Sequence, residues 1–245
     1  MDQKPQASLT LPGAIIIAAA LISIAIIWVR KPAGAPSTSN QPTLKEVSMA
    51  PVTSADHILG NPDAPIKIVE YSDPSCPYCK IFHPVMKKVI DEYGPSGKVA
   101  WVYRSFPIDK PGSRPDGGIL HPNAGYEAQA QECAAALGGN EAFWKFTDRL
   151  YEVTQSDQGI TLDRSEAPKI AAYIGLDAIN FNECLSSERF KGKVEKSYLD
   201  GLNAGVSGTP YSIIITPSGS KIPLVGLQSH ATLKQAIDAL LSEVK

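Results

Sequence analysis

The stretch GNPDAPIKIVEYSDPSCPYCKIFHP, residues 60–84, decides the fold of this chain. It contains an apolar run rich in β-branched residues, Ile66–Tyr71, which predicts a strand. Apolar residues then recur at helical spacing from Cys76 to Tyr93, which predicts a helix. The C-x-x-C motif Cys76–Cys79 therefore stands where a strand gives way to the first turn of a helix.

This position favours redox chemistry at the two cysteines. The start of a helix offers unpaired N–H groups and the positive end of the helix dipole, and both stabilise a thiolate at Cys76. Cys79 lies one turn further in and suits the resolving role, while Pro77 fits the first helical turn. A zinc site would need two more ligands, and Cys133 and Cys184 do not form a second C-x-x-C. We therefore expect no metal; a purely structural bridge across the motif is the other alternative.

Glu70 occupies an interior position of the predicted strand, six residues before Cys76. A carboxyl group buried beneath the start of the helix would have a raised pKa and could relay a proton to or from Cys79. The alternative is a glutamate on an edge strand that faces water.

The dipeptide Thr209-Pro210 precedes a second apolar run, Tyr211–Ile215. Proline at the mouth of a strand cannot donate to the sheet, and a cis bond there would form a purposeful turn. Such a turn would leave the Thr209 backbone free to pair with an extended peptide. An ordinary trans proline that opens a strand is the alternative.

From residue 57 onward the sequence predicts an α/β domain with a mixed sheet, helices on both faces and a helical insertion over about 121–204. The expected strands cover 66–71, 98–106, 211–215 and 221–225, the last two as a hairpin, and the expected helices cover 76–93, 122–137, 141–155, 164–174, 178–185, 189–204 and 230–244.

The segment LPGAIIIAAALISIAIIWV, residues 11–29, has no charged residue and is long enough to cross a bilayer as a helix. We expect an uncleaved signal anchor over 1–31; a cleaved signal peptide and a buried core helix are the alternatives. A linker rich in Pro, Ala, Ser and Thr follows over 32–56 and leads to the domain over 57–245. Arg30 and Lys31 oppose an external position of that domain, but the cysteine chemistry favours it.

The composition excludes several classes of protein. Of 245 residues, 43% are hydrophobic and 20% are charged, which is globular and excludes general disorder. The net charge of −2 lacks the basic footprint of a nucleic-acid-binding protein, so no such partner is expected. Four cysteines are too few for a disulfide scaffold in a chain of this length.

Residues 60–84, together with GVSGTPYSIIITPSG at 205–219, resemble the DsbA-like thiol:disulfide oxidoreductases of the thioredoxin superfamily. The likeness extends over about 58–244 and implies a thioredoxin-like fold with an inserted helical subdomain. It implies the following site residues: Cys76 as nucleophile, Cys79 as resolving cysteine, Glu70 as buried acid, Pro210 as cis-proline, and Pro77, Tyr78 and Thr209 around the substrate. The Pro77-Tyr78 dipeptide also resembles glutaredoxins, which are shorter and lack the insertion.

The resemblance implies an enzyme that introduces disulfides into reduced or misoxidised secreted proteins. It implies reoxidation by a membrane quinone reductase of the DsbB or VKOR type, with no bound cofactor. The expected location is the cell membrane, with the catalytic domain facing the periplasm or cell exterior. Because the dipeptide of the motif helps to set the redox poise, an isomerase or reductase of the same fold stays open. A binding or chaperone module with a structural C-x-x-C is a further alternative.

Cys133 and Cys184 both lie in the predicted insertion. Each could be an inert buried residue, but unpaired thiols are unfavourable in an oxidising compartment. Some relatives in the family that this sequence resembles carry a bridge in the same two helices, which implies a structural Cys133–Cys184 disulfide.

Overall fold

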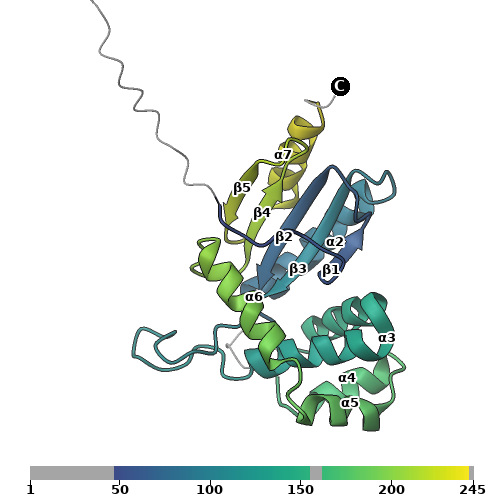
Figure 1. Ribbon diagram of the computed structural model, residues 1–245, viewed down its shortest axis with the longest axis vertical. Helices are drawn as coiled ribbons and strands as arrows, with labels where there is room; N and C mark the ends of the chain where they lie inside the picture. The colour runs from purple at the N-terminus through teal and green to yellow at the C-terminus, as the bar shows by residue number, and fades with distance from the viewer. Residues whose placement is uncertain (1–46, 155–161, 243–245) are drawn as a thin grey trace, which may run out of the picture. The chain divides into compact units, whose positions relative to one another are not determined.

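A five-stranded mixed sheet forms the centre of the fold (Figure 1). The computed structural model describes residues 47–154 and 162–242. The strands run in the order β1-β3-β2-β4-β5; β2 and β3 are parallel, and the other neighbours are antiparallel. Their bounds are β1 His57–Gly60, β2 Ile66–Ser72, β3 Val99–Ser105, β4 Tyr211–Ile215 and β5 Lys221–Val225. The predicted α/β class, strand order along the chain and hairpin are confirmed.

Both faces of the sheet are covered, which explains the nearly continuous apolar character of β2. Ile66 and Ile68 pack with helices α2 (Pro77–Tyr93) and α7 (His230–Ser242) on one face. Val69 and Tyr71 alternate with them and lie in a second cluster on the opposite face, where α6 (Lys191–Asn203) packs. Gly201 of α6 makes this approach close, since a Cβ there would lie 2.5 Å from Phe106.

The inserted helices α3 (Ala124–Val153), α4 (Glu166–Tyr173) and α5 (Ala178–Ser186) pack against one another beyond the end of the sheet (Figure 1). They share a hydrophobic cluster that also contains Cys76 and Cys79. Two predicted helices join in α3 at Gly139, whose φ of +72° interrupts the helical backbone. The insertion therefore contributes directly to the surroundings of the C-x-x-C motif.

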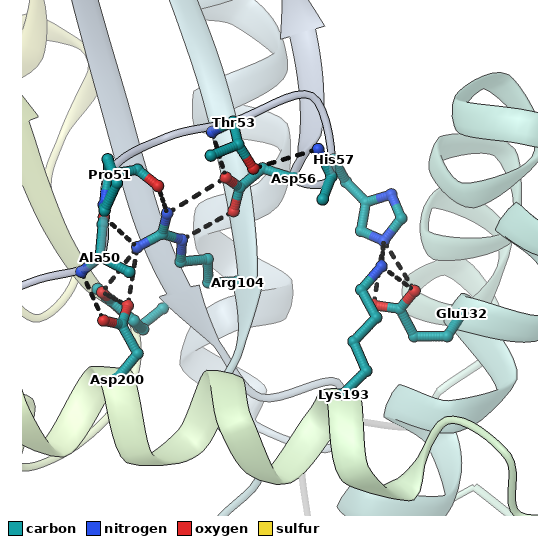
Figure 2. A network of polar contacts seen from close by, with 11 residues as sticks. Ala50, Pro51, Thr53, Asp56, His57, Arg104, Glu132, Lys193 and Asp200 are labelled. Atoms are coloured by element: carbon teal, nitrogen blue, oxygen red, sulfur yellow. Dashed lines mark hydrogen bonds and ion pairs between the residues drawn. The ribbon is translucent and has the colours of Figure 1, made fainter.

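Strand β1 was not predicted, because four residues are too short to show a β pattern. It pairs antiparallel with β3, and the residues before it also contact the domain. Arg104 of β3 donates to Asp56 at 2.8 Å, to Asp200 at 2.8 Å and to the carbonyl oxygens of Ala50 and Pro51 at 3.0 Å (Figure 2). The described end of the predicted linker thus lies against the sheet and α6.

A second polar cluster ties β1 to the insertion (Figure 2). The carboxylate of Glu132, on α3, lies 3.1 Å from Nε2 of His57 and accepts from Nζ of Lys193, on α6, at 2.6 Å. Glu132 is buried, and these partners lower its pKa against the effect of burial. The insertion is therefore held to the sheet by polar contacts as well as by apolar contacts.

The predicted membrane segment at 11–29 and the linker as far as residue 46 lie outside the described residues. Within 47–154 and 162–242, no helix combines the length and the apolar character needed to cross a bilayer.

Candidate active site

The two cysteines of the motif lie at the beginning of α2. Cys76 is the N-cap residue, and Pro77 occupies the first helical position, where its missing N–H costs nothing. Both thiols are free and buried, with Cys76 4% exposed and Cys79 fully covered. Tyr78, between them, is 59% exposed and is available to a partner molecule.

The nucleophile predicted from sequence has a pKa suited to that role. The hydrogen bond from the Cys79 thiol is the main cause that lowers the pKa of Cys76 to about 6, while burial opposes it. The Cys76 thiol lies 3.5 Å from the carbonyl oxygen of Thr209, which the structure brings from the far end of the sequence. The Thr209–Pro210 peptide bond is cis. Cys76, Thr209 and Pro210 thus form one site.

Cys79 behaves in the opposite way. Burial raises the pKa of the Cys79 thiol, and its hydrogen bond to Cys76 and the nearby charge of Glu70 raise it further. The backbone N–H of Asp73 contacts its sulfur at 3.5 Å. Cys79 therefore stays protonated over the pH range in which Cys76 becomes a thiolate.

Glu70 lies beneath this pair and is 1% exposed. Its strand is flanked by β3 and β4, so the alternative of an edge glutamate facing water is excluded. Burial raises the pKa of Glu70 to about 7, although Ser72 and Trp101 hydrogen-bond its carboxylate and oppose the rise. The Trp101 indole N–H donates to Glu70 at 2.9 Å. A carboxyl group with this pKa can both give and take a proton near neutrality.

A second polar network near Cys76 was missed in the sequence. The carboxylate of Asp73 lies 2.8 Å from Nδ1 of His121, and the hydroxyl of Ser75 donates to Glu127 at 2.6 Å. Burial raises the pKa of Glu127 to about 7. Asp73 and Ser75 lie in the quoted stretch 60–84, but no spacing rule links them to residues about fifty positions away.

The second cysteine pair is oxidised in the structure. Cys133 of α3 and Cys184 of α5 form a disulfide whose Cα atoms lie 5.9 Å apart. The bridge joins two helices of the insertion, as the family resemblance implied.

A cavity of about 430 Å³ lies beside the network of Figure 2, between the segment 50–57 and α6. Its lining includes Arg104 and Lys193 but neither cysteine of the motif nor Thr209. Arg104 and Lys193 are already paired with carboxylates. Within the described part of the chain, no group of three or more His, Cys, Asp or Glu residues could hold a metal ion.

Comparison with known proteins places this geometry in a family. A protein-family model with the description Thioredoxin matches residues 52–239 of this chain. The chain belongs to the thioredoxin family. The family match includes the C-x-x-C motif, the inserted helices and the cis-proline loop.

Individual relatives divide into two kinds. The Na(+)/H(+) antiporter NhaA 3 of Salinispora tropica is 31% identical over 163 residues, covering 66% of this chain and 22% of the antiporter. The chain thus spans about a fifth of that protein. Antiport is an activity of that relative and is not assigned to this chain. The probable disulfide bond formation protein D of Bacillus anthracis is 28% identical over 166 residues, covering 64% of this chain and 68% of that protein.

Among solved structures, Pseudomonas aeruginosa DsbA2 superimposes with a TM-score of 0.60 and 26% identity, covering 78% of this chain and 97% of the other. The family member described here therefore has a DsbA-type fold.

Proposed function

We propose that this chain is an extracytoplasmic thiol:disulfide oxidoreductase that introduces disulfides into secreted proteins through Cys76 and Cys79. The proposal rests on the opposite pKa shifts of the two thiols. The pKa of Cys76 is lowered to about 6, and the pKa of Cys79 is raised by burial. A low thiol pKa stabilises the reduced form of such a pair and makes it a stronger oxidant.

The reaction starts from the Cys76–Cys79 disulfide. A substrate thiolate attacks Sγ of Cys76, the Cys76–Cys79 bond breaks, and Cys79 leaves with the electron pair and takes a proton that Glu70 can supply. A second substrate thiolate then attacks the substrate sulfur of the mixed disulfide, and Cys76 leaves as a thiolate. Two electrons pass from the substrate dithiol to the enzyme, and a substrate disulfide forms.

The surroundings of Cys76 fit a protein substrate. The exposed Tyr78 and the partly exposed Thr209 flank the nucleophile, and Thr209 offers backbone groups to an extended peptide. Pro77, also partly exposed, completes this rim. We assign substrate contact to these residues, and Pro210 fixes the position of the Thr209 backbone.

The proposed setting is the outer side of the cell membrane, with residues 1–31 as anchor. The Cys133–Cys184 disulfide supports an oxidising compartment, since such bridges are rare in the cytosol. Reoxidation of the reduced enzyme then requires a partner that accepts two electrons, for which a membrane quinone reductase of the DsbB or VKOR type is proposed.

The test is the reduction potential of the Cys76–Cys79 pair in the purified chain, equilibrated against glutathione. Members of the superfamily extend from about −270 mV for reductases to about −120 mV for oxidases. We expect a value toward the upper end. A value near the lower end would assign the chain to a reductase and overturn the proposed direction of electron flow.

A further inference from the structure

Asp73 places a fully buried carboxylate in the loop between β2 and α2, three residues before Cys76. One oxygen accepts from the backbone N–H of Ser75 at 2.7 Å, and the other accepts from the backbone N–H of Ile108 at 2.7 Å. The Asp73 carbonyl oxygen also accepts from the backbone N–H of Cys76 at 3.0 Å. These bonds fix a negative charge close to the nucleophile.

This charge works against the reaction. The Cys79 hydrogen bond lowers the pKa of Cys76, whereas burial and the carboxylate of Asp73 both raise it. A like charge near a thiolate disfavours it, so an unbalanced Asp73 would weaken Cys76 as a leaving group. A positive charge beside Asp73 would offset this effect.

His121 is placed to supply that charge. It is 5% exposed, and its Nδ1 lies 2.8 Å from the Asp73 oxygen that also accepts from Ile108. Burial lowers the pKa of His121, but the Asp73 hydrogen bond and charge outweigh it and leave the pKa raised. Among the described residues, the charges that raise the pKa of this imidazole come from Asp73 in the β2–α2 loop, Cys76 at the start of α2 and Glu127 on α3.

We propose that His121 is a positioning residue that acts on Cys76 through Asp73. Its imidazolium balances the carboxylate beside the nucleophile, so that the reduced pair keeps its thiolate and the oxidised pair remains a strong electron acceptor. This role rests on the proposed function of Cys76, and it adds a residue from the insertion to the redox site.

The chain offers a matched control in His83 on α2. His83 is also buried beside a carboxylate, with Nε2 2.6 Å from Asp148. Burial lowers the pKa of His83 despite this partner, which favours the neutral ring. Asp148 is 35% exposed, whereas Asp73 is fully covered. The pKa values of the two histidines therefore shift in opposite directions, and the charge of Cys76 is among the causes at His121 but not at His83.

The test replaces each histidine by an amide that keeps the hydrogen bond to its aspartate but cannot be protonated. His121→Asn preserves a donor near Nδ1, and His83→Gln preserves one near Nε2. Thiolate absorbance at 240 nm is followed against pH in the reduced full-length chain. We expect the Cys76 midpoint to rise by about one pH unit in His121→Asn, a tenfold change in the thiol–thiolate equilibrium. His83→Gln should leave the midpoint unchanged.

The same variants are equilibrated with glutathione at pH 7. His121→Asn should favour the disulfide form about fivefold more than the parent chain, because the thiolate contributes less to the reduced form. An unchanged midpoint in a folded His121→Asn protein, or an equal shift in His83→Gln, would overturn the role of His121.

A measurement on the unaltered chain covers the case in which His121→Asn does not fold. Coupling is reciprocal, so His121 should titrate at higher pH in the reduced chain than in the disulfide form when followed by NMR, while His83 should not differ. Identical His121 midpoints in the two forms would overturn the inference. Failure of the parent chain to oxidise substrate thiols would instead overturn the proposed function and leave this coupling measurable.

Discussion

The two cysteine pairs lie in one hydrophobic cluster but differ in their chemistry. All four residues are between 0% and 5% exposed, so burial does not distinguish them. Cys133 and Cys184 lie inside α3 and α5 and are bonded to each other. Cys76 caps α2, Cys79 lies in its first turn, and both are thiols.

The comparison indicates that the hydrogen-bond donors near a buried sulfur decide what it does. Inside a helix each N–H is used by a carbonyl four residues earlier, so no donor is left to stabilise a thiolate. At the first turn the N–H groups are free, and Cys76 also accepts a hydrogen bond from the Cys79 thiol. Cys76 at the helix start is therefore the reactive cysteine, whereas the two cysteines in helix interiors form a structural bridge.

Removing the nucleophile should have the largest effect of the changes considered. Cys76→Ser should lower the oxidation rate of a reduced substrate protein by at least about a thousandfold, on the scale found when a nucleophile is lost. The rate is measured by fluorescence or peptide mapping of the substrate. Full activity in the serine variant would assign the motif a structural role and remove the catalytic interpretation.

Removing the structural pair should have the converse effect. The double change Cys133→Ala with Cys184→Ala opens a loop with a sequence separation of 51 residues. In the chain-entropy model this costs up to about 4 kcal/mol of unfolding free energy, measured by denaturant titration. The Cys76 midpoint and the substrate oxidation rate at 25 °C should stay at parental values. A large change in either would show that the bridge also tunes the redox site.

Glu70→Gln removes a proton carrier that serves Cys76 and Cys79 and leaves the Cys133–Cys184 pair unaltered. Loss of general acid catalysis for the departing Cys79 should slow substrate oxidation by about a hundredfold near pH 7. The control is Asp148→Asn, which alters the partner of the buried His83 and should retain the parental rate. An equal loss in both variants would indicate general destabilisation.

The same Glu70 variant should be more stable than the parent chain in alkaline solution. Burial raises the pKa of Glu70 to about 7 from 4.5, so ionising it opposes folding. This cost is absent below about pH 4.5, grows as the pH rises and is complete above about pH 7. Unfolding free energies should therefore converge at pH 4 and favour Glu70→Gln at pH 8. Equal stability at pH 8 would contradict a buried, ionisable Glu70.

The smallest test needs no substitution. Alkylation of the reduced chain by iodoacetamide should follow the Cys76 thiolate, with a midpoint near pH 6 rather than near 9. The lowered pKa stabilises the folded reduced chain against unfolding. This contribution is complete above about pH 9 and is lost as the pH falls through 6. Mass spectrometry should find the label on Cys76 and not on Cys79. Equal labelling would contradict the opposed pKa values of the two thiols.

The sequence predicted most elements of the fold because their signals are local. The apolar run of β2, the helical spacing of α2 and the break at Gly139 are each contained in a short window. Strand β1 was not predicted because its four residues are ordered by pairing with β3, not by a pattern of their own. The contacts of Ala50 and Pro51 with Arg104 escaped for the same reason.

By itself, the sequence determined the chemistry that one helix start can perform, because the order strand, C-x-x-C and helix fixes which sulfur meets the free N–H groups. Only the tertiary structure decided which charges surround that sulfur. Thr209 and His121 reach the site from 133 and 45 positions beyond Cys76, and Glu70 acquires its raised pKa from burial between neighbouring strands. The reason is physical: desolvation and Coulomb interactions depend on distance in space, whereas a sequence pattern records only distance along the chain.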